Sequence, residues 1–244
     1  QQVARPEQFY QSALSFGHFL KQLGDYPAES LYETIPQFHD TVKRLRDFKD
    51  AQRKDVKNRA RKCKPEIEFV LSREDDCGVL MKQLEEGKLP LRVTHNDTKL
   101  NNILFDADTD EGLCIIDLDT IMPGLAANDF GDSIRFGAST AEEDEPDLDK
   151  VHFDINLYDI YTKGYLEMAK DVLTSAEIAS LSWGARLMTL ECGMRFLADY
   201  LQGDVYFKTA YPEHNLVRAR TQFRLVKEME EQFDQMNEIL KKYI

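Results

Sequence analysis

Two short segments of the sequence hold polar side chains whose types and spacing suit phosphoryl transfer. The first, at 93–105 (VTHNDTKLNNILF), has the order H-x-D-x-K-x-x-N and supplies His95, Asp97, Lys99 and Asn102. The second, at 115–120 (IIDLDT), adds Asp117 and Asp119. Phosphoryl transfer requires a group that orients the attacking hydroxyl and takes its proton, together with metal ions that bridge the phosphate oxygens. The two segments together contain both kinds of group.

The order of these residues predicts a role for each. Asp97, on a loop, is predicted to be the base or the hydroxyl-orienting group. Asn102 and Asp117 are predicted to bind Mg²⁺, because this ion prefers hard oxygen ligands such as amide carbonyls and carboxylates. Lys99 is predicted to neutralise the transferring phosphoryl group.

Three neighbouring residues are predicted to support this site. His95 is expected to brace the loop rather than to carry a proton. Asp119 follows Asp117 by two positions, and on a strand such residues face the same side, so it is predicted to add a third ligand, with turn capping as the alternative. Asp129, in the motif NDFGD, is predicted either to hold the loop backbone by hydrogen bonds or to cap a helix, and both roles stay open.

The elements around these residues predict a small hairpin. Short apolar runs at 102–105 and 113–118 flank the polar stretch DADTDEG at 106–112, which is typical of two strands and a connecting turn. The hairpin would bring Asn102 and Asp117 together. Cys114, in the second run, is expected to be buried.

Most of the remaining sequence predicts helix. Apolar residues recur at helical spacing from Phe9 to Leu23, Thr174 and Glu177 form a capping box ahead of a helix at 178–201, and a last amphipathic helix is predicted at 214–240. The acidic stretch 139–150 is expected to be a mobile loop. Helices followed by a small β island and further helices do not give an alternating βαβ pattern. The predicted fold class is therefore α+β, mostly α-helical.

Composition narrows the function classes. The formal net charge is −13 and no basic face is visible, which disfavours nucleic acid as a partner. No apolar run approaches the length of a membrane span, and residues 1–20 lack the pattern of a secretory signal, so we expect a cytoplasmic protein that does not bind membranes. The 4 cysteines contain no C-x-x-C pair, which argues against a zinc site or a disulfide framework.

The segments HNDTKLNNILFD, CIIDLDT and NDFGDSIRFGA together resemble the aminoglycoside phosphotransferase/choline kinase family, and within it the N-acetylhexosamine 1-kinases. The resemblance extends from FGHFL and ETIPQFHDT to ECGMRFLADYLQGDVYFK. It implies a protein-kinase-like fold and transfer of the γ-phosphate of ATP, with Mg²⁺, to the anomeric hydroxyl of an N-acetylhexosamine in sugar salvage. It also implies that Asp97 is the catalytic aspartate and that Asn102 and Asp117 are the metal ligands.

The same resemblance implies that Leu190, Arg195 and Tyr206 line the sugar site. Taken from the residues alone, Leu190 would be assigned to the core of an apolar helix. Arg195 lies in a mostly apolar helix, where a charge needs a partner or a ligand. Tyr206 could stack on a sugar ring or simply pack.

The chain departs from the family pattern at its N-terminal side. Such kinases carry a glycine-rich strand–turn–strand and a phosphate-anchoring lysine, whereas this sequence contains no G-x-G. We therefore expect residues 1–244 to form the C-terminal, catalytic and substrate-binding lobe, with the N-terminal ATP-clamping lobe absent from this chain, and the isolated fragment to be poorly active.

Other interpretations stay open. A kinase acting on an aminoglycoside, choline or homoserine is the nearest alternative, although Arg195 argues against a cationic substrate. Asp117 and Asp119 could form the D-x-D of a glycosyltransferase, but such enzymes need a nucleotide-binding βαβ domain that the sequence does not predict. A kinase-like lobe kept as a non-catalytic binding module is the third interpretation, and the intact set of Asp97, Asn102 and Asp117 opposes it.

Overall fold

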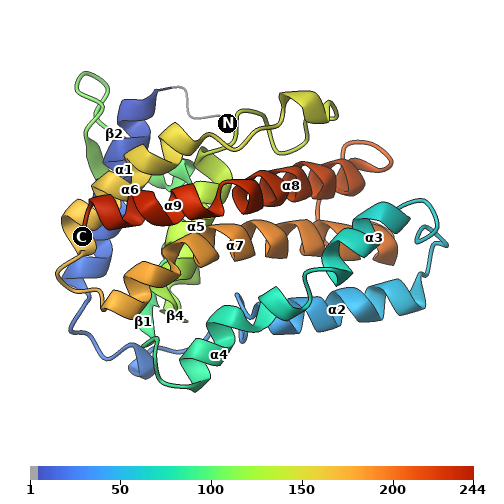
Figure 1. The fold of residues 1–244 in the computed structure, drawn as a ribbon, viewed down its shortest axis with the longest axis horizontal. Helices are drawn as coiled ribbons and strands as arrows, with labels where there is room; N and C mark the ends of the chain where they lie inside the picture. Colours follow the sequence, from blue (N-terminus) through green and yellow to red (C-terminus); the bar gives the residue numbers. More distant parts are fainter. Residues whose placement is uncertain (1–4) are drawn as a thin grey trace.

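The computed structural model describes residues 5–244 and is mostly helical, as the sequence predicts (Figure 1). In chain order, the α-helices are α1 (Pro6–Gln22), α2 (Thr41–Lys54), α3 (Lys64–Leu71), α4 (Val79–Glu85), α5 (Ala126–Gly137), α6 (Ile155–Ala169), α7 (Ser175–Gln202), α8 (His214–Glu231) and α9 (Phe233–Lys242). Residues 1–4, which include the start of the segment tested for a secretory signal, lie outside the described part of the chain.

Four short strands form two antiparallel pairs between α4 and α5. They are β1 (Arg92–Thr94), β2 (Ile103–Phe105), β3 (Gly112–Ile115) and β4 (Met122–Gly124). β2 pairs with β3, with Ile103 opposite Ile115, and β1 pairs with β4, with Val93 opposite Pro123. The β1–β4 pair was not predicted from the sequence, because it joins segments that lie far apart along the chain.

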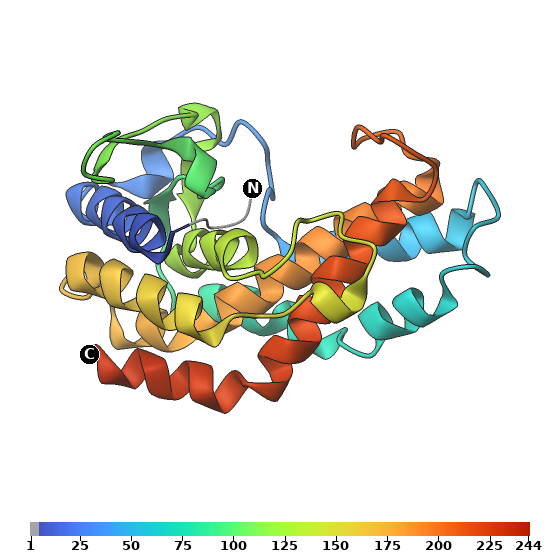
Figure 2. The ribbon, with the colours of Figure 1, turned by 90° about the horizontal axis from the view of Figure 1, so that it is seen from above.

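Helix α7 is the central element of the fold. It packs against α5, α8 and α2, while α1 packs against α6. Figures 1 and 2 both place the strands and α1 at one end of the molecule and the connection from α2 to α3 at the other. A long, rigid α7 therefore runs from below the strands to the far end and can carry residues toward both regions.

Helices α5 and α7 approach closely because each contributes a glycine at the crossing. A Cβ atom on Gly131 would meet the backbone of Gly184, and one on Gly184 would meet the backbone of Ala127. Small residues at this point allow the two backbones to come into contact, which fixes the position of α5 beneath the strands.

The capping box predicted for α7 is present, whereas the long helix predicted at the end of the chain needs correction. The side chain of Thr174 accepts from the N–H of Glu177, whose carboxylate accepts from the N–H of Thr174. The helix predicted at 214–240 is instead two helices, α8 and α9, because the backbone leaves the helical conformation at Gln232 (φ −108°, ψ 12°). Apolar periodicity continues across this break and so did not reveal it.

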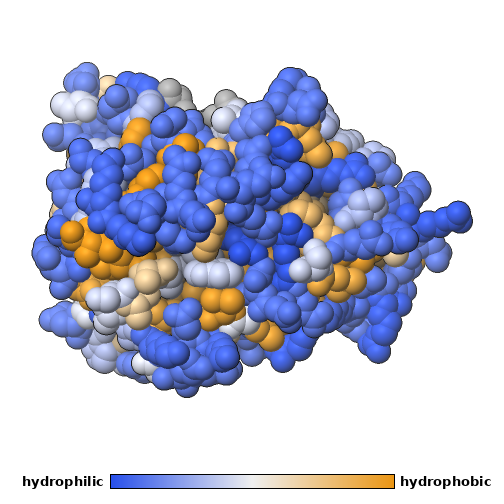
Figure 3. Space-filling view, viewed as in Figure 1, coloured by the Kyte–Doolittle hydropathy of each residue, from blue (hydrophilic) through white to orange (hydrophobic). Residues whose placement is uncertain are grey.

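Most exposed side chains of the described residues are polar, and the hairpin exposes several apolar side chains. Among residues 5–244, no helix is both long enough and apolar enough to span a bilayer. The face seen in Figure 3 is mostly hydrophilic, with several separate apolar areas. On the hairpin, Leu104 and Leu113 are half or more exposed, and Cys114 is also exposed. The expectation that Cys114 is buried is wrong, because nothing in the described chain covers this side of β3.

Candidate active site

The loop between β1 and β2 gathers the first set of predicted residues. The carboxylate of Asp97 lies 2.6 Å from Lys99 Nζ and accepts a hydrogen bond from Asn102 Nδ2 at 3.0 Å. The same amide nitrogen donates to the backbone carbonyl of Asp97 at 2.8 Å. Asp97 is partly exposed and Asn102 is buried. A carboxylate held on one side by an amide and on the other by an ammonium is fixed in direction while it remains reachable from solvent.

The backbone brings Asp117 next to this loop. The N–H of Ile116 donates to the carbonyl of Asn102 at 2.9 Å, so the residue that follows lies beside the start of β2. Asp117 has a left-handed backbone (φ 62°), which turns its exposed side chain away from the line of β3. The hydrogen bond places the residue before Asp117 against Asn102, and convergence of the two side chains on one ion stays a prediction.

The predicted placement of Asp119 on a strand with Asp117 needs correction. The prediction assumed that Asp117 and Asp119 share a strand, but β3 ends at Ile115 and Asp119 lies in a 3₁₀ turn at Leu118–Thr120. The same-face relation of a strand therefore does not hold. Asp119 is exposed, and its role as a metal ligand has no support from strand geometry.

The donor set suits Mg²⁺ bound together with a nucleotide. The Nδ2 of Asn102 donates to Asp97. The Oδ1 of Asn102 makes no hydrogen bond with residues 5–244, so this oxygen can face a cation. Within the same residues, no three His, Cys, Asp or Glu side chains gather closely enough to hold a metal. Mg²⁺ typically binds one or two protein carboxylates and takes its remaining ligands from phosphates and water. The residues present therefore fit an ion that arrives with its substrate.

His95 connects the loop to the segment before Asp117. Its ring is fully buried, packs edge-on against Phe16 with ring centroids 5.5 Å apart, and places Nε2 3.1 Å from the carbonyl of Ile116. A carbonyl only accepts, so Nε2 carries the proton. This geometry is that of a brace between the two halves of the site, since the ring has no exposed nitrogen to offer a substrate.

Asp129 holds the loop from below. Its two carboxylate oxygens accept the backbone N–H groups of His95 and Asn96, each at 2.8 Å. It lies within the first turn of α5, and the residue at the N-cap position is Leu125. Of the two roles left open by the sequence, the contacts are those of loop support. Burial raises the pKa of Asp129 to about 6, although the two backbone hydrogen bonds oppose this shift.

A second acid of α5 holds the other flank of Asp97, and sequence reasoning missed it. Asp132 accepts the N–H of Thr98 at 3.0 Å, and Ser133 donates to the carbonyl of Thr98 at 2.7 Å. Asp132 follows Asp129 by three positions, which puts both carboxylates on one helix face. That spacing within NDFGD was the signal that could have identified it.

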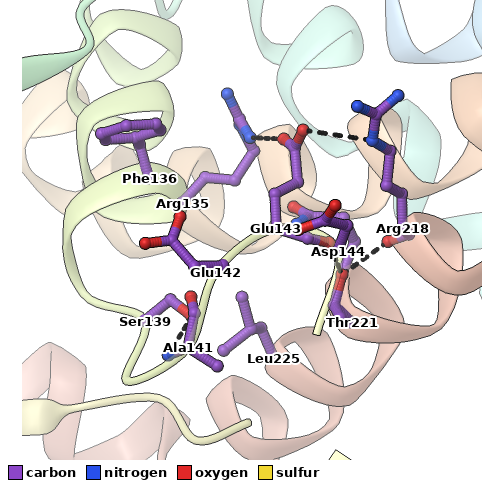
Figure 4. Close-up of a pocket in the computed structure, with 11 residues that line it drawn as sticks. Arg135, Phe136, Ser139, Ala141, Glu142, Glu143, Asp144, Arg218, Thr221 and Leu225 are labelled. Carbon is purple, nitrogen blue, oxygen red and sulfur yellow. Dashed lines mark hydrogen bonds and ion pairs between the residues drawn. The ribbon is translucent and has the colours of Figure 1, made fainter. Parts of the chain in front are cut away.

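The acidic loop expected to be mobile is tied down beside Asp132. Arg135 is buried and pairs with Asp132 and with Glu143, both at 3.0 Å, while Arg218 of α8 lies 3.9 Å from Glu143. Figure 4 shows Arg135 and Arg218 on opposite sides of Glu143. These residues line a cavity of about 240 Å³. The loop is therefore connected, through two ion pairs, to the peptide group next to Asp97.

Two of the three residues predicted to bind the substrate share one pocket. Arg195 and Tyr206 line a cavity of about 350 Å³, together with Phe38 and Phe207. The guanidinium carbon of Arg195 lies 5.8, 5.9 and 5.5 Å from the ring centres of Phe38, Tyr206 and Phe207. Among residues 5–244, Arg195 has no hydrogen bond and no ion pair. Its donors are therefore available to a ligand.

Leu190 does not belong to that pocket. Its side chain is fully buried in the core, and it lines none of the cavities described above. The prediction that it contacts the substrate is not supported, whereas the assignment made from its apolar helix face is. Helix α7 carries Leu190 and Arg195 on different sides because five positions turn an α-helix by about 500°, which is about 140° beyond one full turn.

Two of the acids that line the Arg195 pocket are already ion-paired. Asp47 lies 2.6 Å from Lys43 Nζ, and Asp50 lies 2.5 Å from both Arg53 and Lys54. The pocket therefore presents two ion-paired carboxylates, one carboxylate (Asp199) held by the backbone N–H groups of residues 205–207, and the guanidinium of Arg195. This balance favours polar or anionic ligand groups over a cationic one.

Comparison with known proteins identifies the group to which this arrangement belongs. A family model described as "Phosphotransferase enzyme family" matches residues 2–165, which include the loop, the hairpin and Asp129 but not Arg195 or Tyr206. The structure is similar to that of a choline kinase from Cryptosporidium parvum Iowa II, with a TM-score of 0.56 and 15% sequence identity. The alignment covers 97% of this chain and 69% of the choline kinase. At that identity the likeness shows a shared, kinase-like fold.

Proposed function

Because the chain belongs to the phosphotransferase enzyme family, we propose that it transfers the γ-phosphoryl group of ATP to the anomeric hydroxyl of an N-acetylhexosamine. The family match and the choline kinase-like fold make it a small-molecule phosphotransferase. The observation that carries the proposal is the contact of Asp97 with both Asn102 and Lys99, beside Asp117. We place the reaction in sugar salvage, since a free N-acetylhexosamine is the substrate.

In this proposal Asp97 orients the acceptor. The sugar oxygen attacks the γ-phosphorus, the bond from that phosphorus to the bridging oxygen of ADP breaks, and the hydroxyl proton passes to a carboxylate oxygen of Asp97. The hydrogen bond from Asn102 fixes the direction of the carboxylate. Lys99 exchanges its contact with Asp97 for the transferring phosphoryl group, whose charge it neutralises.

In this proposal Asn102 and Asp117 would hold Mg²⁺, and Asp119 would approach the ion from the next turn. The bound ion would neutralise charge on the phosphate oxygens. The protein residues contribute one amide oxygen and the carboxylates, and His95 keeps the two segments in register through its bond to the carbonyl of Ile116. The ion is thus expected to enter with ATP.

The pocket of Arg195 supports a sugar over the alternatives. Its guanidinium can donate to hydroxyl and acetyl oxygens, and the faces of Phe38, Tyr206 and Phe207 can pack against the C–H face of a pyranose. Choline or an aminoglycoside would place a positive charge beside Arg195 while Asp47 and Asp50 are already paired. Homoserine, which is zwitterionic, is disfavoured less strongly.

We further propose that a nucleotide-clamping N-terminal lobe outside this chain completes the ATP site. The exposed leucines of the hairpin region, Leu104, Leu113 and Leu118, are 51%, 64% and 52% exposed. Leu113 and Leu118 line one cavity together, and exposed apolar side chains of this kind favour contact with a base or with another protein segment. Such a lobe would also supply the glycine-rich turn that the sequence lacks.

The test is an acceptor panel with the full-length protein. ADP release would be measured with MgATP and each of N-acetylglucosamine, N-acetylgalactosamine, choline, an aminoglycoside and homoserine, with Asp97→Asn as the blank. We expect turnover with an N-acetylhexosamine and none with choline. Preference for a cationic acceptor would overturn the sugar assignment and leave the phosphotransferase assignment in place. Absence of turnover with every acceptor, together with sugar binding by calorimetry, would favour the non-catalytic binding module.

A further inference from the structure

His39, in the segment between α1 and α2, touches the catalytic loop from a side that no residue of the H-x-D motif reaches. Its Nε2 lies 3.1 Å from the backbone carbonyl of Asn96, the residue immediately before Asp97. Its Nδ1 lies 3.0 Å from Glu191 Oε1 of α7. The imidazole therefore links the loop to the central helix of the fold.

Both partners of His39 accept hydrogen bonds. A backbone carbonyl has no proton to give, and an ionised carboxylate has none either, so each ring nitrogen must donate. Only the imidazolium form donates from both nitrogens. Glu191 is almost completely buried, at 1% exposed, and an unpaired carboxylate there would be costly. The contact geometry thus calls for a charged pair rather than a neutral ring.

The carbonyl that His39 holds belongs to the peptide bond that joins Asn96 to Asp97. Asn96 has a left-handed backbone (φ 62°), a conformation that needs support from its surroundings. Its N–H is held by Asp129 and its side chain donates to the carbonyl of Thr120 at 2.9 Å. Its carbonyl is the remaining backbone group, and His39 is the donor that fixes it.

We propose that His39, paired with Glu191, is a positioning residue that orients the Asn96–Asp97 peptide group and hence the carboxylate of Asp97. This role rests on the phosphotransferase function proposed above. His39 acts through Asn96 and does not touch the reacting atoms. Release of the imidazole from the carbonyl lets the peptide plane rotate, which moves Asp97 away from the acceptor hydroxyl and lowers kcat with little effect on nucleotide binding.

The charges around His39 favour its protonated form. Burial lowers its pKa, but the hydrogen bond to Glu191 and the charges of Glu191 and Asp132 outweigh this, so the pKa lies above the ordinary 6.5. Asp129 of α5 acts in the same direction, since it and His39 stabilise each other's charged forms. On α2, Arg44 lies 3.8 Å from Glu191 and opposes the charge on His39, while Thr41 donates to the second oxygen of Glu191 at 3.3 Å.

The raised pKa of His39 determines how kcat should depend on pH. A histidine whose pKa is raised by folding contributes stability that is fully present below the unfolded value and is lost as pH rises through the folded value. The contact with Asn96 should therefore be complete at mildly acidic pH and weaken on the alkaline side. The kcat of the wild-type protein is expected to fall there with the titration of one group.

The chain offers a matched control in His152. Its Nδ1 lies 2.9 Å from Glu228 Oε1 and its Nε2 lies 2.9 Å from the carbonyl of Asp149, which is the same arrangement of a carboxylate and a carbonyl. The pKa of His152 is also raised, chiefly by Glu228. His152 makes these two contacts away from Asn96 and Asp97 and at a more exposed position, with its side chain 48% exposed against 8% for His39.

The experiment compares kcat and KM across pH for the wild type, His39→Ala, His39→Gln and His152→Ala in the full-length protein. We expect His39→Ala to lose roughly 10- to 100-fold in kcat with the KM for ATP changed by about twofold or less. His39→Gln keeps an amide donor for Asn96 and cannot ionise, so it should recover much of kcat and lose the alkaline decline. His152→Ala should match the wild type.

Two results would overturn the proposal. One is a kcat of His39→Ala within about twofold of the wild type, and the other is an alkaline limb that persists unchanged in His39→Gln. If His39→Ala does not fold, ring ¹⁵N shifts of His39 in the wild type decide the matter, since a neutral ring at pH 6.5 contradicts the paired imidazolium. Lack of turnover by the wild type with every acceptor would instead reject the proposed function, and the ring titration would still report on the contact.

Discussion

The catalytic loop and the pocket around Arg195 differ in how far their polar groups are satisfied within the chain. In the loop, the peptide groups of Asn96 and Thr98 are held by acids of α5 and by Ser133, and His39 takes the last carbonyl. In the pocket, the guanidinium of Arg195 lies among aromatic rings with no acceptor from residues 5–244. The difference indicates that the loop is built to be rigid and the pocket to be completed by a ligand.

The largest effect is expected from the carboxylate at the centre of the rigid region. Asp97→Asn should lower kcat by about 10³-fold or more, because the amide cannot take the hydroxyl proton. The variant keeps a side chain of the same shape for Asn102, so the free energy of unfolding should change by less than about 1 kcal/mol. Steady-state kinetics and chemical denaturation measure the two quantities. The exposed Asp108→Asn is the matched control, and comparable turnover by both variants would reject Asp97 as the base.

Removing the support beneath the loop should have the next largest effect. Asp129→Ala leaves the buried N–H groups of His95 and Asn96 unpaired, which should cost about 2–6 kcal/mol of stability and roughly 10- to 100-fold in kcat. Denaturant melts and kinetics check this prediction. Asp159→Ala, which removes a surface pair with Lys242, should cost less than about 1 kcal/mol. Equal losses in the two variants would mean that Asp129 does not hold the loop.

The same carboxylate gives a pH prediction. The pKa of Asp129 is raised to about 6 by burial, so the stability it contributes is present below the unfolded value of 3.8 and is lost as pH rises through about 6. The advantage of the wild type over Asp129→Asn should therefore shrink between about pH 4 and pH 7, by up to about 3 kcal/mol. Melts of both proteins at several pH values test the sign, and a gap that widens with pH would contradict it.

In the open pocket, Arg195→Ala should act on the acceptor alone. We expect the KM for the sugar to rise roughly 10- to 100-fold, as for loss of a charged hydrogen bond, while the KM for ATP changes by about twofold or less. Initial-rate kinetics with each substrate varied in turn measure both. Arg220→Ala, which breaks a pair with Glu66 on α3, is the control and should change neither constant. Equal increases in both constants would argue against a sugar-site role for Arg195.

The smallest effect is expected at the edge of the pocket. Tyr206 is 71% exposed, and its ring contributes one face beside Arg195. Tyr206→Ala should raise the KM for the sugar by about 2- to 5-fold, the loss expected for an exposed ring contact. Val205→Ala, at an equally exposed neighbour, should leave the KM unchanged. If Tyr206→Ala exceeded Arg195→Ala in effect, aromatic stacking rather than the guanidinium would dominate acceptor binding.

Local signals in the sequence predicted local structure well. The capping box at Thr174 and Glu177 starts α7 as expected, because both partners lie within one turn. The order of Asp97 and Asn102 also placed them correctly, since they share one loop. The break at Gln232 was missed because the apolar pattern of α8 and α9 continues through it.

Contacts between segments that are far apart along the chain could not be predicted from the sequence. His39, in an irregular segment, contacts both Asn96 and Glu191 of α7, and no spacing within the chain indicates that meeting. For Leu190, burial in the core agrees with the assignment made from its apolar helix face, and the substrate role that the resemblance implied stays a prediction without structural support. The same-face relation assumed for Asp117 and Asp119 does not hold, because β3 ends at Ile115 and Asp117 has a left-handed backbone.

The attachment of the loop to α7 has a consequence for the order of events during synthesis. Asn96 leaves the ribosome well before Glu191, and at roughly 5–20 residues per second the interval is some seconds. Until α7 emerges, His39 has no carboxylate to hold it, and the carbonyl of Asn96 lacks the support that the complete fold provides. If His39 positions Asp97 as proposed, phosphoryl transfer would wait for α7, and incomplete translation products would turn over little nucleotide.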